Sequence, residues 1–533
     1  MSRTVLVVGS GASAVHFAQS VLARGWAVTM LDIGFEGAEP TLPDAHFGEL
    51  KEQLDDPVRY LLGDAFEGAL LPGTKGEYYG TPPSQAFVFR ELAGHGFDAA
   101  GFTPLFSWAR GGLAGAWTGG CYPFNDDDLA DFPFDYDALD PYYSEVSRRI
   151  GISGDRDDLA RFLPVHEHLL APLDLDEHSM DLVAAYRRRR PAINRLGCYV
   201  GRTRVATLTR PLHGRDACGY LGRCLWGCPL RALYTPAHTL EELRRYPDFE
   251  YRPGWRVRRF RYADGRVECV VAEPLDGGPV REFTADRIVL GAGALNTAEI
   301  VLRSVHEATG ERVRLTGLMD NRQVLVPFVN WRMIGRPVHS DRYQYHLLGL
   351  GLSTPDAREY VHCQVTTLKA AMMHPITQRL PFDLATAAAF TRLMHSSLGL
   401  INLNFHDTRR DSNTVSLEPA DDGTLRLALR YEPDLSERSR MRSALGRIRR
   451  ALRLLGCIVP PGLQHVRPMG ASVHYAGMLP MADAGRFTTD ANGRSRDWDN
   501  LWIVDGSTFP FLPAKNITFT LMANAARIAE NAF

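Results

Sequence analysis

Apolar and polar positions in the first 34 residues predict a strand, a helix and a second strand. The apolar run from Val5 to Val8 is typical of a strand buried on both faces of a parallel sheet. Apolar residues then recur at helical spacing, at Ala14, Phe17, Ala18, Val21 and Leu22. The run AVTML follows at 27–31 and ends at Asp32. This order indicates the first unit of a parallel α/β sheet.

Two distant segments repeat the pattern of a strand followed by a helix. Residues 286–304 read DRIVLGAGALNTAEIVLRS, an apolar strand, small residues and a helix. Near the chain end, NLWIVDG predicts a strand that stops at Asp505-Gly506, and we expect a helix to open at Asn516. One face of that helix is apolar, at Ile517, Leu521, Ala525 and Ile528. The sheet is therefore expected to draw its strands from both ends of the chain.

The middle of the chain predicts further strands. Residues 255–275 look like a hairpin turned by Asp264-Gly265. Within 311–466 the runs HLLGLGLS, GLINLNF and TLRLALRY are strand-like, and a basic helix is expected around 436–455. We expect a second sheet backed by helices there. Residues 41–95 look like an excursion that could act as a lid.

Composition narrows the class of protein. A chain of 533 residues is too long for one core, so two or more domains are expected. The net charge of −2 gives no general attraction to nucleic acid, and RRRR at 187–190 is interpreted as a solvated helix face. Without a run of 18 apolar residues or a signal-peptide pattern, we expect no membrane partner and a cytoplasmic location.

The turn after the first predicted strand has the chemistry of a dinucleotide site. Gly9 permits the tight turn, Gly11 lets a pyrophosphate approach the backbone, and Ala14 allows close packing of helix on strand. The phosphates would meet a helix N-terminus, and Asp32 would accept hydrogen bonds from a ribose. This pattern does not separate NAD from FAD. The hairpin at 255–275, followed by a strand with a Gly-Ala-Gly turn, is typical of FAD-binding flavoproteins and favours FAD.

Several of these segments resemble signatures of the glucose–methanol–choline (GMC) oxidoreductases. NLWIVDGSTFP followed by NITFTLMANAARIAE is similar to the closing signature of that family, and GALNTAEIVLRS is similar to its second signature. RGGLAGAWTGG at 110–120 resembles the loop that approaches the flavin, and FPFDYDALDPYYSEV resembles the stretch that follows it. The likeness covers about half the chain. Residues 311–466 match little.

The resemblance implies a mixed α/β fold, the GMC fold, with a Rossmann-like FAD-binding domain and an interleaved substrate domain built on a sheet backed by helices. It implies a discontinuous FAD domain in 1–310, with 151–200 assigned either to it or to the substrate domain. The substrate domain would then be 311–466, and 467–533 would return to the FAD domain. The implied cofactor contacts are Gly9, Gly11, Ala12, Ser13, Asp32, Gly111, Gly112, Trp117, Val257, Ala292, Asp505, Gly506, Asn516, Ile517 and Thr518.

The chain departs from the family pattern at three positions. Ala14 replaces the third glycine, and Ile517 follows Asn516 where proline is usual. Ala116 lies near where some sugar-oxidising relatives carry a histidine linked covalently to FAD. We therefore expect FAD to be held non-covalently.

Alcohol oxidation requires a base for the hydroxyl proton, and histidine has a suitable pKa. The resemblance implies that His474, in an H-x-x-G stretch, is this base and that the carbinol hydride passes to flavin N5. Asn516, 42 residues later, would hold the oxygen and also cap the helix. His465 is the alternative base, and Lys515 would either add charge at the flavin or point outward. The acceptor is O₂ or an electron carrier.

The substrate is less defined by the sequence. A polyhydroxylated alcohol, such as a sugar or aminoglycoside hydroxymethyl group, is favoured over another specialised-metabolite alcohol or a sterol. A non-redox flavin-dependent lyase and a non-catalytic FAD-binding protein remain as alternatives. Cys218, Cys224 and Cys228 have a spacing that fits a metal site, a redox disulfide or buried thiols, and we expect no metal. The oligomeric state is not indicated.

Overall fold

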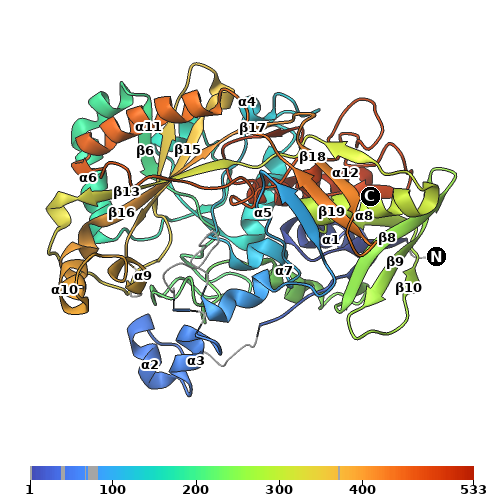
Figure 1. Cartoon of the computed structure of the whole chain (residues 1–533), viewed down its shortest axis with the longest axis horizontal. Helices are drawn as coiled ribbons and strands as arrows, with labels where there is room; N and C mark the ends of the chain where they lie inside the picture. The colour runs from blue at the N-terminus through green and yellow to red at the C-terminus, as the bar shows by residue number, and fades with distance from the viewer. Residues whose placement is uncertain (1–2, 38–42, 67, 70–81, 370–372) are drawn as a thin grey trace.

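A computed structural model describes residues 3–37, 43–66, 68–69, 82–369 and 373–533. Two large sheets lie beside one another along the long axis of the molecule (Figure 1). Both chain ends lie at the right of the view, with the helices that pack on a five-stranded parallel sheet. The helices α6 (Glu177–Asn194) and α11 (Glu437–Leu454) lie at the left, with a seven-stranded sheet.

The parallel sheet has the strand order β22-β11-β1-β2-β7. Its members are β1 (Thr4–Val8), β2 (Ala27–Leu31), β7 (Phe249–Arg252), β11 (Arg287–Leu290) and β22 (Leu501–Ile503). β1 is central, and Val8 pairs with Leu31 on one side and Leu290 on the other. The strands expected from both ends of the chain therefore do form one sheet.

Alternate residues of these strands face opposite layers, as the two-residue period of a strand requires. Val5 and Val7 pack against α1 (Ala12–Leu22) and α12 (Thr518–Ala532). Leu6 and Val8 pack against α8 (Ala294–Thr309) and the hairpin of β8 (Trp255–Ala263) and β9 (Arg266–Pro274). Each fully buried aliphatic side chain in these layers contributes about 1.5–3 kcal/mol by burial.

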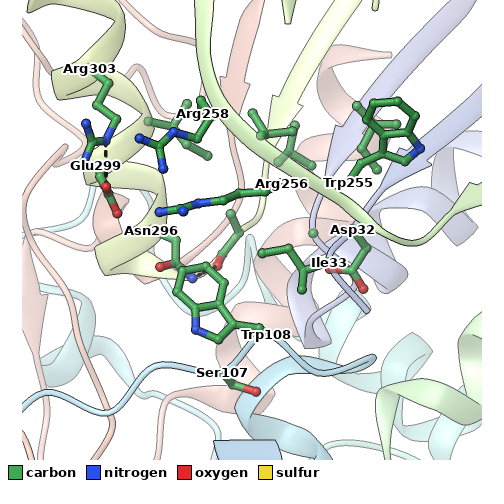
Figure 2. A pocket seen from close by; sticks show the side chains of 16 residues that line it. Asp32, Ile33, Ser107, Trp108, Trp255, Arg256, Arg258, Asn296, Glu299 and Arg303 are labelled. Atoms are coloured by element: carbon green, nitrogen blue, oxygen red, sulfur yellow. Dashed lines mark hydrogen bonds and ion pairs between the residues drawn. The ribbon is translucent and has the colours of Figure 1, made fainter. Parts of the chain in front are cut away.

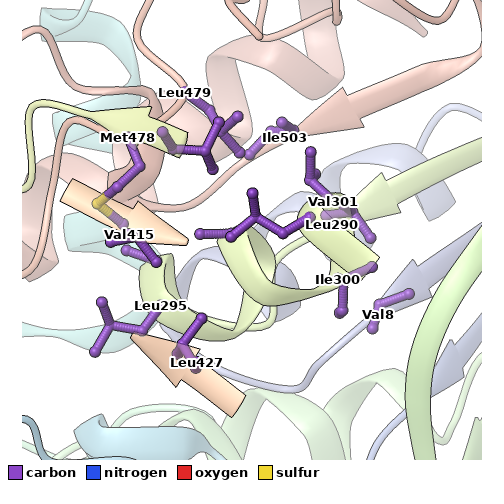
Figure 3. Packing of buried hydrophobic residues seen from close by; sticks show 14 of the residues in the cluster. Val8, Leu290, Leu295, Ile300, Val301, Val415, Leu427, Met478, Leu479 and Ile503 are labelled. Carbon is purple, nitrogen blue, oxygen red and sulfur yellow. The ribbon is translucent and has the colours of Figure 1, made fainter. Parts of the chain in front are cut away.

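A four-stranded sheet covers the outer side of α8. Its strands are β12 (Arg314–Thr316), β18 (Thr414–Pro419), β19 (Leu425–Arg430) and β3 (Phe97–Ala100). Figure 3 shows Val415 and Leu427 of this sheet against Leu295 of α8, in one core with Leu290 and Ile503. Part of the segment 311–466 therefore packs on the parallel sheet rather than with its own sequence neighbours.

The seven-stranded sheet has one apolar and one polar face. It contains β20 (Cys457–Ile458), β13 (Arg322–Asn330), β16 (Leu398–Phe405), β15 (Val361–Thr367), β14 (Leu348–Leu352), β6 (Cys198–Arg202) and, paired with β13, β21 (His465–Val466). On β15, Val361, Cys363 and Val365 join the core beneath α6 and α11. His362 and Gln364 alternate with them and therefore point to the other face.

The mixed α/β fold predicted from the sequence, with a parallel sheet and a second sheet backed by helices, is confirmed. The hairpin turns where expected, with Asp264 and Gly265 both at positive φ (47° and 71°). The domain boundaries at 310 and 466 remain a prediction, as does a lid at 41–95, of which 41–42, 67 and 70–81 lie outside the described residues. Among the helices described, none combines the length and hydrophobicity that crossing a bilayer requires.

Candidate active site

A cleft with about 940 Å³ of empty space opens at the carboxyl ends of the parallel strands. Open α/β sheets bind ligands at this edge. The turn after β1, the turn from β11 to α8, and the N-terminal end of α12 all contribute to its walls. Predicted residues that line it are Gly9, Gly11, Ala12, Ser13, Asp32, Gly111, Gly112, Ala292, His474, Asp505, Gly506, Ile517 and Thr518.

Glycines give this cleft the shape and the donors that a diphosphate needs. Gly9 has φ +97°, and a Cβ there would lie 2.6 Å from the carbonyl oxygen of Gly291. Gly11 and Gly293 are the N-caps of α1 and α8, and neither helix start is capped by a side chain. A Cβ on either glycine would meet no atom within 4 Å. The first turns of both helices line the cleft without a capping side chain, which suits an anionic group.

Asp32 lies at the end of β2 with its carboxylate engaged in hydrogen bonds. Its Oδ2 accepts hydrogen bonds from the Ser10 hydroxyl and, at 2.9 Å, from the Tyr251 hydroxyl. The backbone N–H groups of Ile33 and Gly34 also donate to the Asp32 carboxylate. Burial raises the pKa of Asp32 to about 6, against the opposing effect of these hydroxyl donors. The carboxylate lines the cleft, and its predicted contact with a ribose hydroxyl remains a prediction.

His474 is held in one tautomer. Its Nδ1 lies 2.9 Å from Oδ1 of Asn321, and the amide nitrogen of Asn321 donates to the carbonyl oxygens of Phe405 and Pro513, both at 2.9 Å. These two carbonyls fix the amide orientation, so Asn321 Oδ1 must accept the Nδ1–H of His474. The other ring nitrogen, Nε2, is left as an acceptor on a side chain that lines the cleft.

The charge state of His474 also suits a base. Burial lowers the pKa of His474 to about 4, and the positive charge of Arg467 lowers it in the same direction. The imidazole is therefore neutral at pH 7, with a lone pair on Nε2 available for a proton.

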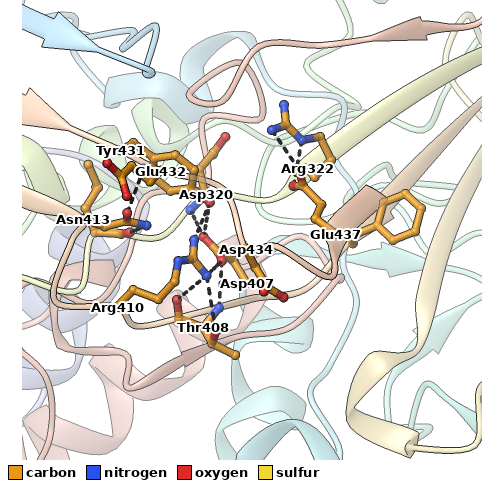
Figure 4. Close-up of polar contacts among 12 residues, drawn as sticks. Asp320, Arg322, Asp407, Thr408, Arg410, Asn413, Tyr431, Glu432, Asp434 and Glu437 are labelled. Atoms are coloured by element: carbon orange, nitrogen blue, oxygen red, sulfur yellow. Dashed lines mark hydrogen bonds and ion pairs between the residues drawn. The ribbon is translucent and has the colours of Figure 1, made fainter. Parts of the chain in front are cut away.

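The Asp320 carboxylate holds the backbone segment that leads to His474. The Asp320 carboxylate accepts hydrogen bonds from Gly470 N at 2.6 Å, from His474 N at 3.3 Å and from the Ser472 hydroxyl. Asp320 is in turn held by Asp407, whose Oδ2 accepts a hydrogen bond from Asp320 N at 3.1 Å. Arg410 and Tyr431 also donate hydrogen bonds to Asp407, which completes a buried polar cluster (Figure 4).

Val473 next to His474 has φ 59°, a strained value for a β-branched residue. Such strain persists only where the surroundings over-determine the backbone, and it concentrates at functional sites. The anchors of Asp320 supply that constraint here.

Comparison with known proteins assigns the C-terminal part of the chain to a family. Residues 409–525, which include His474 and most of α12, match the family described as GMC oxidoreductase. Residues 409–525 therefore belong to the GMC oxidoreductase family.

Three named proteins resemble the chain over most of its length. It is 26% identical to 6'''-hydroxyparomomycin C oxidase of Streptomyces lividus, over 75% of this chain and 71% of the relative. It is 24% identical to 2-methyl-1,2-propanediol dehydrogenase of Mycolicibacterium austroafricanum, over 99% and 94% of the two chains. The crystal structure of pyridoxine 4-oxidase from Mesorbium loti superposes with a TM-score of 0.63 at 17% identity and covers 100% of this chain and 99% of its own. This last likeness concerns the fold.

Asn516 lies beside the cleft but is not the helix cap that the sequence suggested. The N-cap of α12 is Ile517, and no side chain caps it. The amide oxygen of Asn516 instead accepts a hydrogen bond of 3.1 Å from Nε2 of Gln364, on the polar face of the seven-stranded sheet. Because the oxygen is engaged by Gln364, the amide N–H₂ of Asn516 is the group left for a ligand.

Two further expectations from the sequence are corrected. Lys515 neither faces the cleft nor points outward, since it is buried and ion-paired with Asp128. His465 is exposed on β21 and does not line the cleft, so it is not a second candidate base.

Trp117 and Val257 line neighbouring cavities. Trp117 donates to the carbonyl oxygen of Tyr234 at 2.7 Å and lines a space of about 1790 Å³ with Cys224 and Cys228. Cys218, Cys224 and Cys228 are free thiols, and the described residues contain no metal-binding group of three or more His, Cys, Asp or Glu side chains. Val257 lines a cavity of about 540 Å³ that adjoins the cleft. Figure 2 shows this cavity.

The sequence did not single out Asn321 or Gln364. Each is a polar residue among strand-forming neighbours, in the segment that matched no signature. The alternation on β15 assigns Gln364 to the face opposite the core, but nothing local indicates that this face meets Asn516.

Proposed function

We propose that this protein is a GMC oxidoreductase that oxidises a CH–OH group to a carbonyl with non-covalently bound FAD. His474 would take the hydroxyl proton on Nε2, and the amide of Asn516 would orient the same oxygen. The observation that supports this most directly is the fixed tautomer of His474, which leaves a neutral acceptor nitrogen on a residue lining the cleft. A bound flavin would supply the hydride acceptor.

The residues present fit an FAD molecule. The uncapped start of α1 at Gly11 suits its diphosphate and Asp32 suits its ribose. Ile517 and Thr518, at the start of α12, line the same cleft as His474. Non-covalent binding is supported by Ala116, which has no nucleophile to form a link. Precipitating the protein with acid should therefore release the flavin into the supernatant.

A polyhydroxylated substrate, such as a sugar or an aminoglycoside, is supported by the polar face of the seven-stranded sheet. Gln364, which reaches Asn516, is paired across the strands with Asn402, and His362 with Asn404. Among the described residues, His362 Nε2 and Asn402 Oδ1 are buried with no hydrogen-bond partner. Buried polar atoms without partners favour a ligand that brings hydroxyl groups.

The test is anaerobic reduction of the purified flavoprotein by a panel of alcohols. The panel should contain aminoglycosides, monosaccharides, 1,2-diols, simple primary alcohols and a sterol. We expect the polyhydroxylated members to bleach the visible absorption of the flavin fastest. Admission of air afterwards distinguishes an oxidase, which recovers its colour at once, from a dehydrogenase.

Failure of every alcohol to bleach a fully loaded flavin would contradict the proposal and favour a lyase or a non-catalytic protein. Faster bleaching by the sterol or the simple alcohols would leave the reaction standing and overturn the choice of substrate.

Replacing Gln364 with leucine tests whether Asn516 is positioned from the sheet. The change removes the donor that holds the Asn516 oxygen, so the amide can turn away from the substrate. We expect kcat to fall about 10-fold, because misplacement of a reacting group by about 1 Å costs up to 10²-fold. Flavin content and absorption spectrum should not change.

Gln344→Leu is the matched control for this substitution. Both glutamines are 8% exposed, but Gln344 donates to the carbonyl oxygens of Ser340 and Arg342 and not to Asn516. An equal loss of kcat in both variants would show that Gln364 has only a structural role.

A further inference from the structure

The cavity of about 540 Å³ beside the cleft has a defined place along the proposed cofactor. It shares Gly9, Asp32 and Ala292 with the cleft, whereas His474 lines the cleft alone. Asp32 is the ribose position of a dinucleotide fold, and the diphosphate lies at the N-terminus of α1. The cavity is therefore where the base beyond that ribose would lie, on the side away from His474.

The walls of this cavity suit a flat aromatic ring. Ile33, Trp108, Val257 and Ile300 provide apolar surface. Trp108 is itself fixed, because its ring is stacked parallel to Phe106 at 6.0 Å and meets His95 edge-on at 4.8 Å. Because the Trp108 side chain is already ordered, an adenine that packs against it would cost little side-chain conformational entropy on binding.

Arg256 crosses the middle of this cavity (Figure 2). The residue is only 8% exposed, and among the described residues its guanidinium takes part in no hydrogen bond or ion pair. Burial lowers the pKa of Arg256 to about 10, which still leaves it charged at pH 7. The guanidinium therefore has donors open to the cavity, which a ligand with acceptor atoms would satisfy.

The other charged groups of the cavity have partners. Arg303 is ion-paired with Glu299 at 2.7 Å, and Glu299 also lies 3.2 Å from the ring of His95. Arg258 lies 3.6 Å from Glu273 on the next strand. A bulge in β8 between Val257 and Arg259 interrupts the regular pairing with β9, and bulges of this kind re-aim side chains near binding sites. Arg256 is thus the unpaired cation among the described residues that line the cavity.

We propose that Arg256 binds the adenine base of FAD. A guanidinium carries only donors and is planar, so it can donate to the ring nitrogens of adenine, which are acceptors, or stack on the ring face. A 2′-phosphate, the other group that an arginine recognises here, is disfavoured because Asp32 occupies the ribose position with a carboxylate. This inference rests on the proposed function only in assuming that FAD is the cofactor.

The test measures the preference for FAD over FMN, which lacks the adenosine half. The holoenzyme is equilibrated with equal concentrations of FAD and FMN, and the bound flavins are extracted and quantified. Contact of a base with a planar side chain is worth about 5- to 150-fold in affinity, so Arg256→Met should lower the preference about 10- to 100-fold. Arg256→Lys, which keeps the charge but loses the plane, should show an intermediate loss.

Arg258→Met is the matched control, because Arg258 lies on the same strand and in the same cavity but is paired with Glu273. Its FAD preference should stay within about 2-fold of the parent, since exposed ion pairs contribute little. The visible spectrum of the bound flavin should be the same in all variants, because Arg256 lies away from the His474 end.

An unchanged preference in both Arg256 variants would overturn the assignment, and so would displacement of FAD from the parent by NADP⁺ but not from Arg256→Met. If the parent protein held no flavin at all, the proposed function itself would fail. If it held flavin with a preference that ignores Arg256, only this inference would fail.

Discussion

Replacement of His474 by alanine is expected to lower kcat by about 10²- to 10⁴-fold, the usual contribution of a positioned general base. The loss should appear in the anaerobic rate of flavin reduction by alcohol. Flavin content should be kept, because the diphosphate and ribose positions at Gly11 and Asp32 come from other segments of the chain. His474→Gln, which keeps a polar side chain but cannot accept a proton at this position, should be as slow as His474→Ala.

His406→Ala is the control for this prediction. His406 resembles His474 in burial, at 9% against 7% exposed, and burial lowers its pKa to about 4 as well. It packs against Phe511 and does not line the cleft. Retention of activity in His406→Ala is expected. If His474→Ala reduced its flavin as fast as the parent, the role of His474 as base would be excluded.

The pH dependence of kcat/KM gives a second measure of the same base. The neutral imidazole is the active form, so activity is lost as the pH falls through the folded-state pKa of His474, which is about 4. We therefore expect no loss of kcat/KM as the pH falls through 6.5, the pKa of an ordinary histidine. The acid limb should lie well below that pH and should be absent from the residual activity of His474→Ala.

The sequence alone could predict that Gly9, Gly11 and Asp32 line one site, because their signals are local. Gly9, Gly11 and Asp32 lie within one strand–turn–helix–strand unit, and each requirement, a positive φ, an open backbone or a terminal carboxylate, belongs to one residue type. The structure brings these residues together in one cleft. The turn at Asp264-Gly265 could be predicted for the same reason, because its positive φ values depend on those two residues alone.

The contacts that set the chemistry of His474 could not be predicted, because they join distant segments. Asn321 and His474 are 153 residues apart in the sequence, and Gln364 and Asn516 are 152 residues apart. Helical propensity and spacing also misplaced the start of the last helix. Asparagine is a good N-cap residue, but the side-chain oxygen of Asn516 accepts a hydrogen bond from Gln364 instead. This tertiary contact overrides a local capping preference of about 1 kcal/mol.

The ion pair of Lys515 also could not be predicted, because it joins distant segments. A lone lysine before a helix suggests either a surface position or a role at an anionic ligand. It is instead buried against Asp128, and it also donates to the carbonyl oxygens of Pro123 and Phe162. The acidic run at 125–140 gave no sign that one member, Asp128, would receive this partner, because ion pairing across the fold has no signature in either segment.

Replacement of Asn321 by leucine is expected to lower kcat about 10²-fold with little change in KM. Without the Asn321 oxygen, the Nδ1–H of His474 is buried and unpaired, which favours the tautomer that carries its proton on Nε2. In that tautomer Nε2 is a donor and cannot take the alcohol proton. A carboxylate that orients a catalytic histidine is worth about 10⁴ in kcat, and a neutral amide should contribute less.

Two further variants separate this orienting role from a structural one. Asn413→Leu removes an equally buried asparagine that bonds the backbone of Leu318 and Glu432, and it should keep kcat per bound flavin. Asn321→Asp should recover most of the activity. In this variant one carboxyl oxygen takes the place of the amide nitrogen and lies next to the carbonyl oxygens of Phe405 and Pro513, which favours its protonation. The other carboxyl oxygen then remains an acceptor for the Nδ1–H of His474. If Asn321→Leu kept full kcat per flavin, or if Asn321→Asp were as slow as Asn321→Leu, the tautomer of His474 would not be set by Asn321.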